Sequence, residues 1–143
     1  MLKLKEAQQL CEAVLQYGQD RQLHPLTVSV LDTGGHPLCI LRHERSGILR
    51  YEIAFGKAWG ALGLGMGTRV YSELTAAEGT SQSFVHALMN ASAGRVVPTR
   101  GGVLIRNVSG DLLGAIGVSG DTPQNDESAA LYALNHFNFI AQP

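Results

Sequence analysis

Apolar residues recur along this chain with two alternating periods, and these predict an order of helices and strands. Spacings of three and four residues predict long helices over residues 4–19, 48–64 and 123–139. Alternating or short continuous apolar runs predict strands over residues 26–32, 38–42, 103–107 and 112–118. Weaker patterns predict short helices over residues 68–75 and 81–91, and a short strand over residues 95–98.

The four clear strands form two pairs, and helices separate the pairs. Asp32-Thr33-Gly34-Gly35-His36-Pro37 has the composition of a tight turn within the first pair, and Val108-Ser109-Gly110-Asp111 that of a turn within the second. Two hairpins separated by helices predict an α+β fold, with an antiparallel sheet of about five strands and the helices packed on it. A length of 143 residues predicts a single domain over residues 1–143.

The stretch from residue 112 to residue 127 reads as a buried strand that runs straight into a helix. Gly114 and Gly117 interrupt the apolar strand and predict that another backbone or a ligand comes close. Residues 119–121 have turn composition, and Thr122-Pro123 predicts a helix start with a hydroxyl N-cap. Such a corner is also common as a purely structural feature, so it does not define a site by itself.

The predicted helix over residues 48–64 carries a stripe of small residues beside its large apolar ones. Each glycine in a helix costs about 1 kcal/mol in propensity, so the stripe predicts tight packing against a sheet or a second subunit. Lys57 lies within this stripe. Partial burial would lower its pKa and suit it to act as a base or an anion anchor, whereas the alternative is a lysine that extends from the helix to water.

Composition excludes several classes of partner. The net charge of −1 gives no electrostatic signal for nucleic acid or an acidic membrane. No apolar run approaches the roughly 20 residues that span a bilayer, and the N-terminus lacks the apolar core of a signal peptide, so we expect a cytoplasmic protein. Cys11 and Cys39 have no metal-ligand spacing around them, and we expect two core residues and no metal site.

Three segments carry a resemblance: Val28 to His36 (VSVLDTGGH), Ala54 to Ala58 (AFGKA), and Gly94 to Glu127, which contains GRVVP, GAIGVSG and QNDE. In this order and spacing they resemble the haem-degrading-domain family, which includes the GlcG and HbpS proteins and the C-terminal domain of PduO-type corrinoid adenosyltransferases. The resemblance covers about residues 4 to 135. It implies an α+β domain of profilin-like or PAS-like shape, assembly into dimers or higher oligomers, and haem binding in some members.

The chain departs from the family pattern in two polar segments that bear on a ligand pocket. Residues 42–47 (RHERSG) stand where many relatives have a shorter Arg-x-Asp-Gly run, and Thr99-Arg100 precedes Gly101-Gly102 where relatives often have an aromatic or apolar residue. Arg42 and Arg45 in the first segment are able to bind a carboxylate, although a solvated loop is the simpler interpretation. Ligand identity therefore does not transfer directly from relatives.

The first functional hypothesis is an oligomeric protein that binds haem or another tetrapyrrole. Haem iron is held by His, Cys, Met or Tyr, and a single axial ligand needs no fixed sequence spacing. The chain has five histidines, of which His24 and His36 flank the first strand and are the preferred ligand candidates.

The second hypothesis is an enzyme or accessory protein that acts on a small organic carboxylate. Lys57, an arginine such as Arg42 or Arg100, and the N–H groups that follow Gly120 would form the anion site. The groups considered as acid, base or ligand contacts are Asp121, Asp126 and Glu127. A third hypothesis is an oligomeric scaffold that binds no ligand.

Overall fold

The computed structural model describes residues 1–143, with the exception of the side chain of Thr80. The helices are α1 (Leu4–Asp20), α2 (Arg50–Leu64), α3 (Thr68–Ala76), α4 (Thr80–Ala91) and α5 (Pro123–His136). The strands are β1 (Thr27–Asp32), β2 (Pro37–Arg42), β3 (Gly102–Arg106), β4 (Leu112–Ser119) and β5 (Ile140–Gln142).

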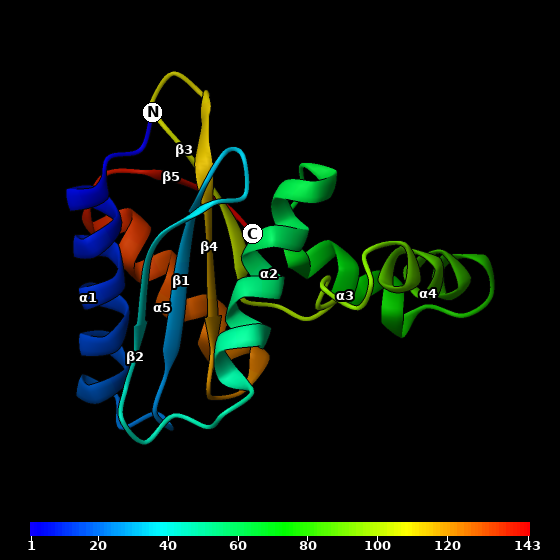
Figure 1. Ribbon diagram of the computed structural model, residues 1–143, viewed down its shortest axis with the longest axis horizontal. Helices are drawn as coiled ribbons and strands as arrows, with labels where there is room; N and C mark the ends of the chain where they lie inside the picture. The colour runs from blue at the N-terminus through cyan, green and yellow to red at the C-terminus, as the bar shows by residue number, and fades with distance from the viewer.

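The five strands form one antiparallel sheet in the order β2-β1-β4-β3-β5, with β4 at its centre. Helices α1 and α5 cover one face and α2 covers the other, while α3 and α4 extend to one side of this body (Figure 1). The predicted α+β fold with about five antiparallel strands is therefore confirmed. Among the helices that the structure describes, none has the length and apolar character to cross a bilayer.

Alternate residues of the central strands enter two separate hydrophobic clusters. Val28, Val30 and Ile116 pack under α1 and α5, whereas Leu31 and Ala115 pack under α2. This division follows from the two-residue period of a strand, in which neighbouring side chains point to opposite faces. Both faces are covered, which explains why β4 reads as a continuous apolar run.

The sheet and α2 approach each other closely because glycines stand at their contact. A Cβ atom on Gly117 of β4 would overlap the carbonyl oxygen of Ala54 in α2, and one on Gly102 of β3 would overlap the carbonyl oxygen of Lys57. Likewise, a Cβ on Gly114 would overlap the carbonyl oxygen of Leu31 in β1. The predicted close approach of another backbone to the glycines of β4 is thus confirmed.

One predicted helix end and one predicted strand are wrong. The last helix ends at His136 and not at Phe139, because Asn138 takes a left-handed conformation (φ 60°) and the N–H of Phe139 donates to the carbonyl of Leu134 at 2.9 Å. The chain then turns back and forms β5 against β3. Residues 95–98 form no strand, since Pro98 has no N–H for a ladder and Val96 packs instead against Gly60 of α2.

Candidate functional site

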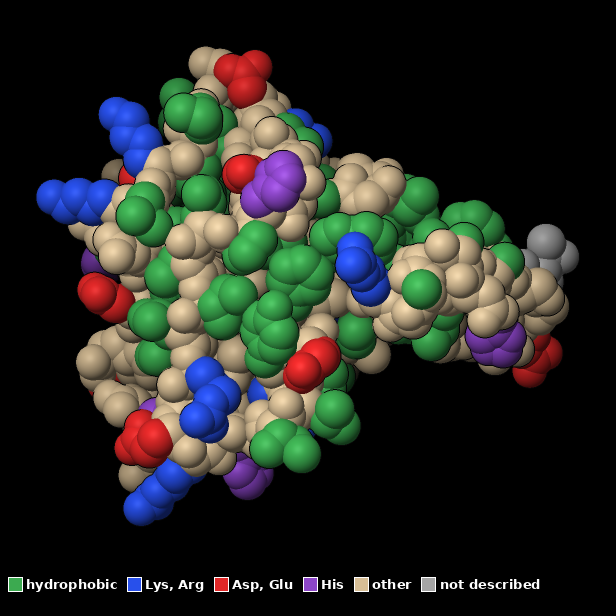
Figure 2. Space-filling view, in the orientation of Figure 1, with side chains coloured by type: hydrophobic (Ala, Val, Ile, Leu, Met, Phe, Trp, Pro, Cys, Tyr) green, Lys and Arg blue, Asp and Glu red, His purple; other side chains and the backbone are tan. Residues whose placement is uncertain are grey.

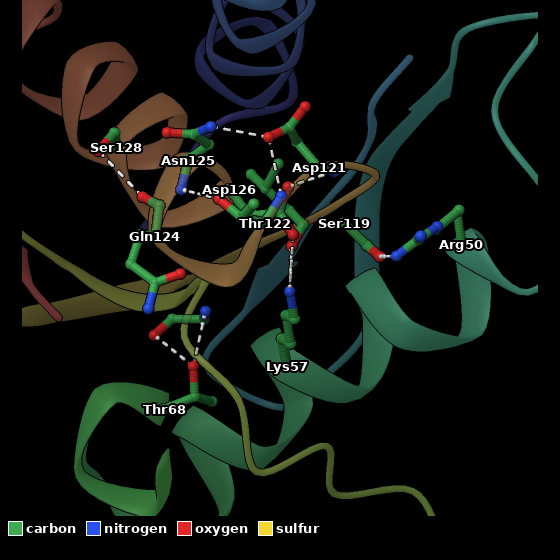
Figure 3. A network of polar contacts seen from close by, with 12 residues as sticks. Arg50, Lys57, Thr68, Ser119, Asp121, Thr122, Gln124, Asn125, Asp126 and Ser128 are labelled. Carbon is green, nitrogen blue, oxygen red and sulfur yellow. Dashed lines mark hydrogen bonds and ion pairs between the residues drawn. The ribbon is translucent and has the colours of Figure 1, made fainter. Parts of the chain in front are cut away.

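A buried ion pair connects α2 to the corner between β4 and α5. The Nζ atom of Lys57 donates to Oδ2 of Asp126 at 3.0 Å and to the carbonyl oxygen of Val118 at 2.8 Å. The other oxygen of Asp126 accepts the backbone N–H of Asp121 at 2.9 Å. Figure 3 shows Lys57 pointing from α2 into this corner. The predicted stripe of small residues therefore surrounds a lysine that is directed inward.

Burial dominates the electrostatics of this pair. It lowers the pKa of Lys57 and raises the pKa of Asp126, and each shift is opposed by the attraction between the two groups. Because internal partners occupy both groups, neither is directed to an open pocket. The structure therefore brings together Lys57 and Asp126, two of the predicted catalytic residues. Their ion pair joins α2 to the corner between β4 and α5.

Glu127, the third predicted catalytic residue, lies in a separate ion cluster. Arg69 of α3 donates to both its carboxylate oxygens, at 2.6 and 3.2 Å, and Arg100 lies 3.9 Å away. The hydrogen bond to Glu127 raises the pKa of Arg69. Arg100, predicted as a ligand contact, thus lies beside Glu127, and the cluster links α3 and the segment before β3 to α5.

Asp121 holds the loop that contains His24. Its Oδ2 atom accepts the backbone N–H of His24 at 2.7 Å, and Oδ1 accepts the N–H of Thr122 and the amide of Asn125 at 2.8 and 2.7 Å. Burial acts to raise the pKa of Asp121, but these hydrogen bonds outweigh it and the pKa lies below its usual value. Thr122 accepts the N–H of Asn125 at 3.2 Å, which confirms the predicted N-cap.

His24 lines an open pocket of about 350 Å³ whose other polar walls are Arg45, Arg50, Ser46 and the backbone at Gly120. Arg50, at the start of α2, donates to the hydroxyl of Ser119 at 3.0 Å (Figure 3). The pocket therefore places an imidazole beside two guanidinium groups. Sequence reasoning selected His24 and Gly120 but missed Arg50, for which the only local signal was its position at a helix start.

The other side of His24 borders a narrow apolar hollow of about 60 Å³. Leu15, Leu23 and Leu26 form its apolar walls, and His43 lies at its edge. The Nδ1 atom of His43 accepts the N–H of Arg45 at 3.1 Å, and this hydrogen bond holds the connection that follows β2. His24 thus stands between apolar and cationic surroundings.

His36 and Arg42 do not line this pocket. His36 is at the tip of the β1–β2 hairpin, where its side chain is 80% exposed and Nδ1 lies 3.2 Å from Oδ1 of Asp32. The six residues of β1 span about 20 Å, so His24 and His36 of one chain lie too far apart to share one iron. Arg42 donates to three backbone carbonyls, including that of Ser46 at 2.8 Å, and so folds the connection to α2.

A second open pocket, of about 500 Å³, lies on the outer side of α2. Tyr51, Phe55 and Val97 give it apolar walls, and Arg95 supplies a cation. Figure 2 shows hydrophobic side chains gathered over α2 on this face of the molecule. The lining of this pocket therefore combines aromatic rings with one guanidinium group.

Comparison with known proteins finds one matching family and several similar proteins. A family described as haem degrading protein HbpS-like matches residues 2–135. The crystal structure of the PduOC:heme complex superposes with a TM-score of 0.85 over 99% of both chains, at 26% sequence identity. An uncharacterised 15.0 kDa protein from the dhaT–dhaS intergenic region of Citrobacter freundii is 32% identical over 114 residues, which are 80% of this chain and 77% of that protein.

The corrinoid adenosyltransferase PduO of Citrobacter freundii is also similar, with 28% identity over 137 residues. The match covers 96% of this chain but 39% of PduO. The similarity therefore concerns one part of that enzyme.

Proposed function

The chain belongs to the HbpS-like family of haem-degrading proteins, and on this premise we propose that it binds haem, or a related tetrapyrrole, in the pocket around His24. The observation that carries the proposal is the position of His24 between an apolar hollow and the guanidinium groups of Arg45 and Arg50. Haem has an apolar macrocycle, an iron that takes an axial ligand, and two carboxylate side chains. The pocket offers His24 for the iron and Arg45 and Arg50 for the carboxylates, and the apolar hollow of about 60 Å³ adjoins it.

Each residue has a separate role in this proposal. The imidazole of His24 would hold the haem iron, since histidine is a common haem ligand. Arg45 and Arg50 would bind the propionate carboxylates, for which the planar guanidinium group is well suited. Asp121 positions the ligand by holding the backbone of His24. Bound haem would supply the redox and ligand chemistry of its iron.

The rim of the pocket supports an amphipathic ligand or a neighbouring copy of the chain. Ile48 and Leu49, which directly precede Arg50, are 94% and 66% exposed. Exposed large apolar side chains next to a ligand pocket are suited to contact a macrocycle or a second subunit. We propose a homo-oligomer on this ground, in agreement with the assembly that the family resemblance implies.

Similarity to the PduOC:heme complex supports the same function. That domain binds haem by its description, and this chain follows its fold over its whole length. At 26% identity the fold is shared, while the ligand-contacting side chains of this chain must be tested individually.

The test is an absorbance titration of the purified protein with haemin. The proposal predicts a saturable shift of the Soret band that ends near one haem per chain, or at a simple fraction if copies share it. A spectrum that stays the sum of free haemin and protein at micromolar concentrations would remove haem as the ligand.

A small organic carboxylate is the second candidate for the same pocket, because Arg45 and Arg50 form a cationic site with or without haem. Lys57 is only 2% exposed and bonded to Asp126, so the arginines and not Lys57 would hold such an anion. Thermal stabilisation by simple carboxylates that is lost in Arg50→Ala, together with a flat haemin titration, would favour this function.

A further inference from the structure

The two cysteines of the chain meet where α1 packs against β2, the strand at one edge of the sheet (Figure 1). Cys11 lies near the middle of α1 and Cys39 lies on β2. The Sγ atom of Cys11 donates to the carbonyl oxygen of Cys39 at 3.6 Å. Both thiols are free, and neither lines the pocket around His24.

The strand register shows that the side chain of Cys39 faces α1. Cys39 pairs with Val30 of β1 in the antiparallel ladder, and directly paired residues point to the same face of a sheet. Val30 and Cys11 both belong to the hydrophobic cluster under α1 and α5, and Cys39 packs against this cluster. The two thiols therefore enter one interface from opposite sides.

The two thiols differ in their access to solvent. Cys11 is fully buried, whereas Cys39 is only partly buried. Burial raises the pKa of the Cys11 thiol, and the neighbouring Cys39 raises it further. Because the thiolate is the reactive form, Cys11 is protected from reagents in solution. A dissolved oxidant therefore meets Cys39 first, with a second thiol held beside it.

From this arrangement we infer that Cys11 and Cys39 form a redox-active pair, which a hydroperoxide such as hydrogen peroxide oxidises to a disulfide within the chain. The sulfur of Cys39 first attacks the peroxide: an S–O bond forms, the O–O bond breaks, and the leaving hydroxide takes the thiol proton as water. Cys39 is then a sulfenic acid, which condenses readily with a nearby thiol.

Cys11 completes the reaction. Its sulfur attacks the sulfenic sulfur of Cys39, so that the S–S bond forms, the S–O bond breaks, and the second hydroxide leaves with the proton of Cys11 as water. The two thiols thus supply the two electrons that reduce one hydrogen peroxide to two waters. An external dithiol reverses the oxidation by thiol–disulfide exchange.

The disulfide would fasten α1 to the edge strand across 28 positions of the chain. A cross-link of this length restricts the unfolded chain, so the oxidised protein should unfold at a temperature about 5–10 °C above that of the reduced protein. The inference is independent of haem binding, since it uses other residues and its measurements need no haem.

Alkylation followed by mass spectrometry tests the inference on the whole chain. The protein is incubated with hydrogen peroxide, denatured and treated with N-ethylmaleimide. The untreated protein should gain two alkyl groups and the oxidised protein none, because the chain has two cysteines. Peptide mapping should place the bond between Cys11 and Cys39, and dithiothreitol should restore both thiols.

Cys11→Ala and Cys39→Ala form a matched pair of variants. In Cys11→Ala the sulfenic acid of Cys39 should accumulate and react with dimedone, whereas in Cys39→Ala the buried thiol of Cys11 should survive the same treatment. Circular dichroism spectra verify that each variant is folded, and the measurements on the wild type decide without them if either is not.

Four results would each overturn the inference. These are two alkyl groups on the peroxide-treated wild type, a disulfide that forms only between two copies of the chain, oxidation of Cys11 in Cys39→Ala as fast as in the wild type, and an oxidised protein whose unfolding temperature does not rise.

Discussion

The Nζ atom of Lys57 lies 3.0 Å from Oδ2 of Asp126, and the two side chains are 2% and 1% exposed. Lys57 comes from α2 on one face of the sheet, and Asp126 from the first turn of α5. Asp126 also accepts the N–H of Asp121, whose carboxylate holds His24. The ion pair is thus connected through Asp121 to the proposed haem ligand.

Removing one member of this pair should destabilise the protein strongly. Lys57→Met leaves the buried carboxylate of Asp126 without a counter-charge, and loss of one partner of a buried pair costs about 3–5 kcal/mol. The double variant Lys57→Met/Asp126→Asn should recover much of this loss, because no charge remains buried. Urea denaturation measures both values, and a cost below about 1 kcal/mol for Lys57→Met would show that the pair is solvated.

Two glycines differ in the space around them, and substitution by alanine should therefore have opposite effects on stability. Gly117→Ala should destabilise the fold by about 3 kcal/mol, the upper end for overpacking, because the new Cβ meets the backbone of Ala54 and Ala58. Gly63→Ala should stabilise it by about 0.5 kcal/mol, since the new Cβ has no atom within 4 Å and α2 gains helix propensity. Thermal unfolding of the two variants compares them directly, and stability of Gly117→Ala equal to wild type would contradict the packing.

Asp121 should contribute its full stability above about pH 4 and lose this contribution as the pH falls further. Its pKa is lower in the folded protein than in the unfolded chain, where it is about 3.9, so the folded state binds fewer protons. The contribution is complete above the unfolded value and is lost as the pH falls through the folded value. Asp121→Asn should therefore cost about 1 kcal/mol at pH 7, the difference between charged and neutral hydrogen bonds, and less at pH 3. Urea denaturation at both pH values would contradict this if the cost were the same.

The role of Arg50 can be separated from that of the apolar walls by changing the ligand. Arg50→Ala should weaken haemin binding about fivefold, which corresponds to an ion pair of about 1 kcal/mol. The same variant should bind haemin dimethyl ester as the wild type does, because the ester has no propionate charge. Absorbance titrations with both ligands measure the two effects, and equal weakening for both would place the propionates elsewhere.

Local signals in the sequence predicted most of the fold. Thr122-Pro123 marks the start of α5, and the turn from Asp32 to Pro37 fixes the first hairpin, so short-range patterns were sufficient there. The strand β5 was missed because three residues carry little periodicity and its pairing with β3 depends on the distant chain reversal at Asn138. The family resemblance is confirmed by the match over residues 2–135.

The site was harder to predict because its contacts join distant parts of the chain. His24 and Asp121 were both selected, but their hydrogen bond spans 97 positions and no spacing rule indicates it. The pairing of Lys57 with Asp126 and that of Arg69 with Glu127 also depend on how the helices pack. Roles in ligand binding stay predictions for His24, His36, Arg42, Arg100, Gly120 and Asp121, as do catalytic roles for Lys57, Asp126 and Glu127.

The most direct test of the account is a haemin titration of His24→Ala beside His86→Ala, followed by absorbance. His86 lies exposed on α4, so its variant controls for the loss of any surface histidine. We predict a changed Soret position and an affinity at least about tenfold lower for His24→Ala, because loss of even an outer-shell partner of a metal costs 10- to 100-fold. His86→Ala should bind as the wild type does. Unchanged affinity and an unchanged spectrum for His24→Ala would contradict the account and direct attention to the pocket of Tyr51 and Arg95.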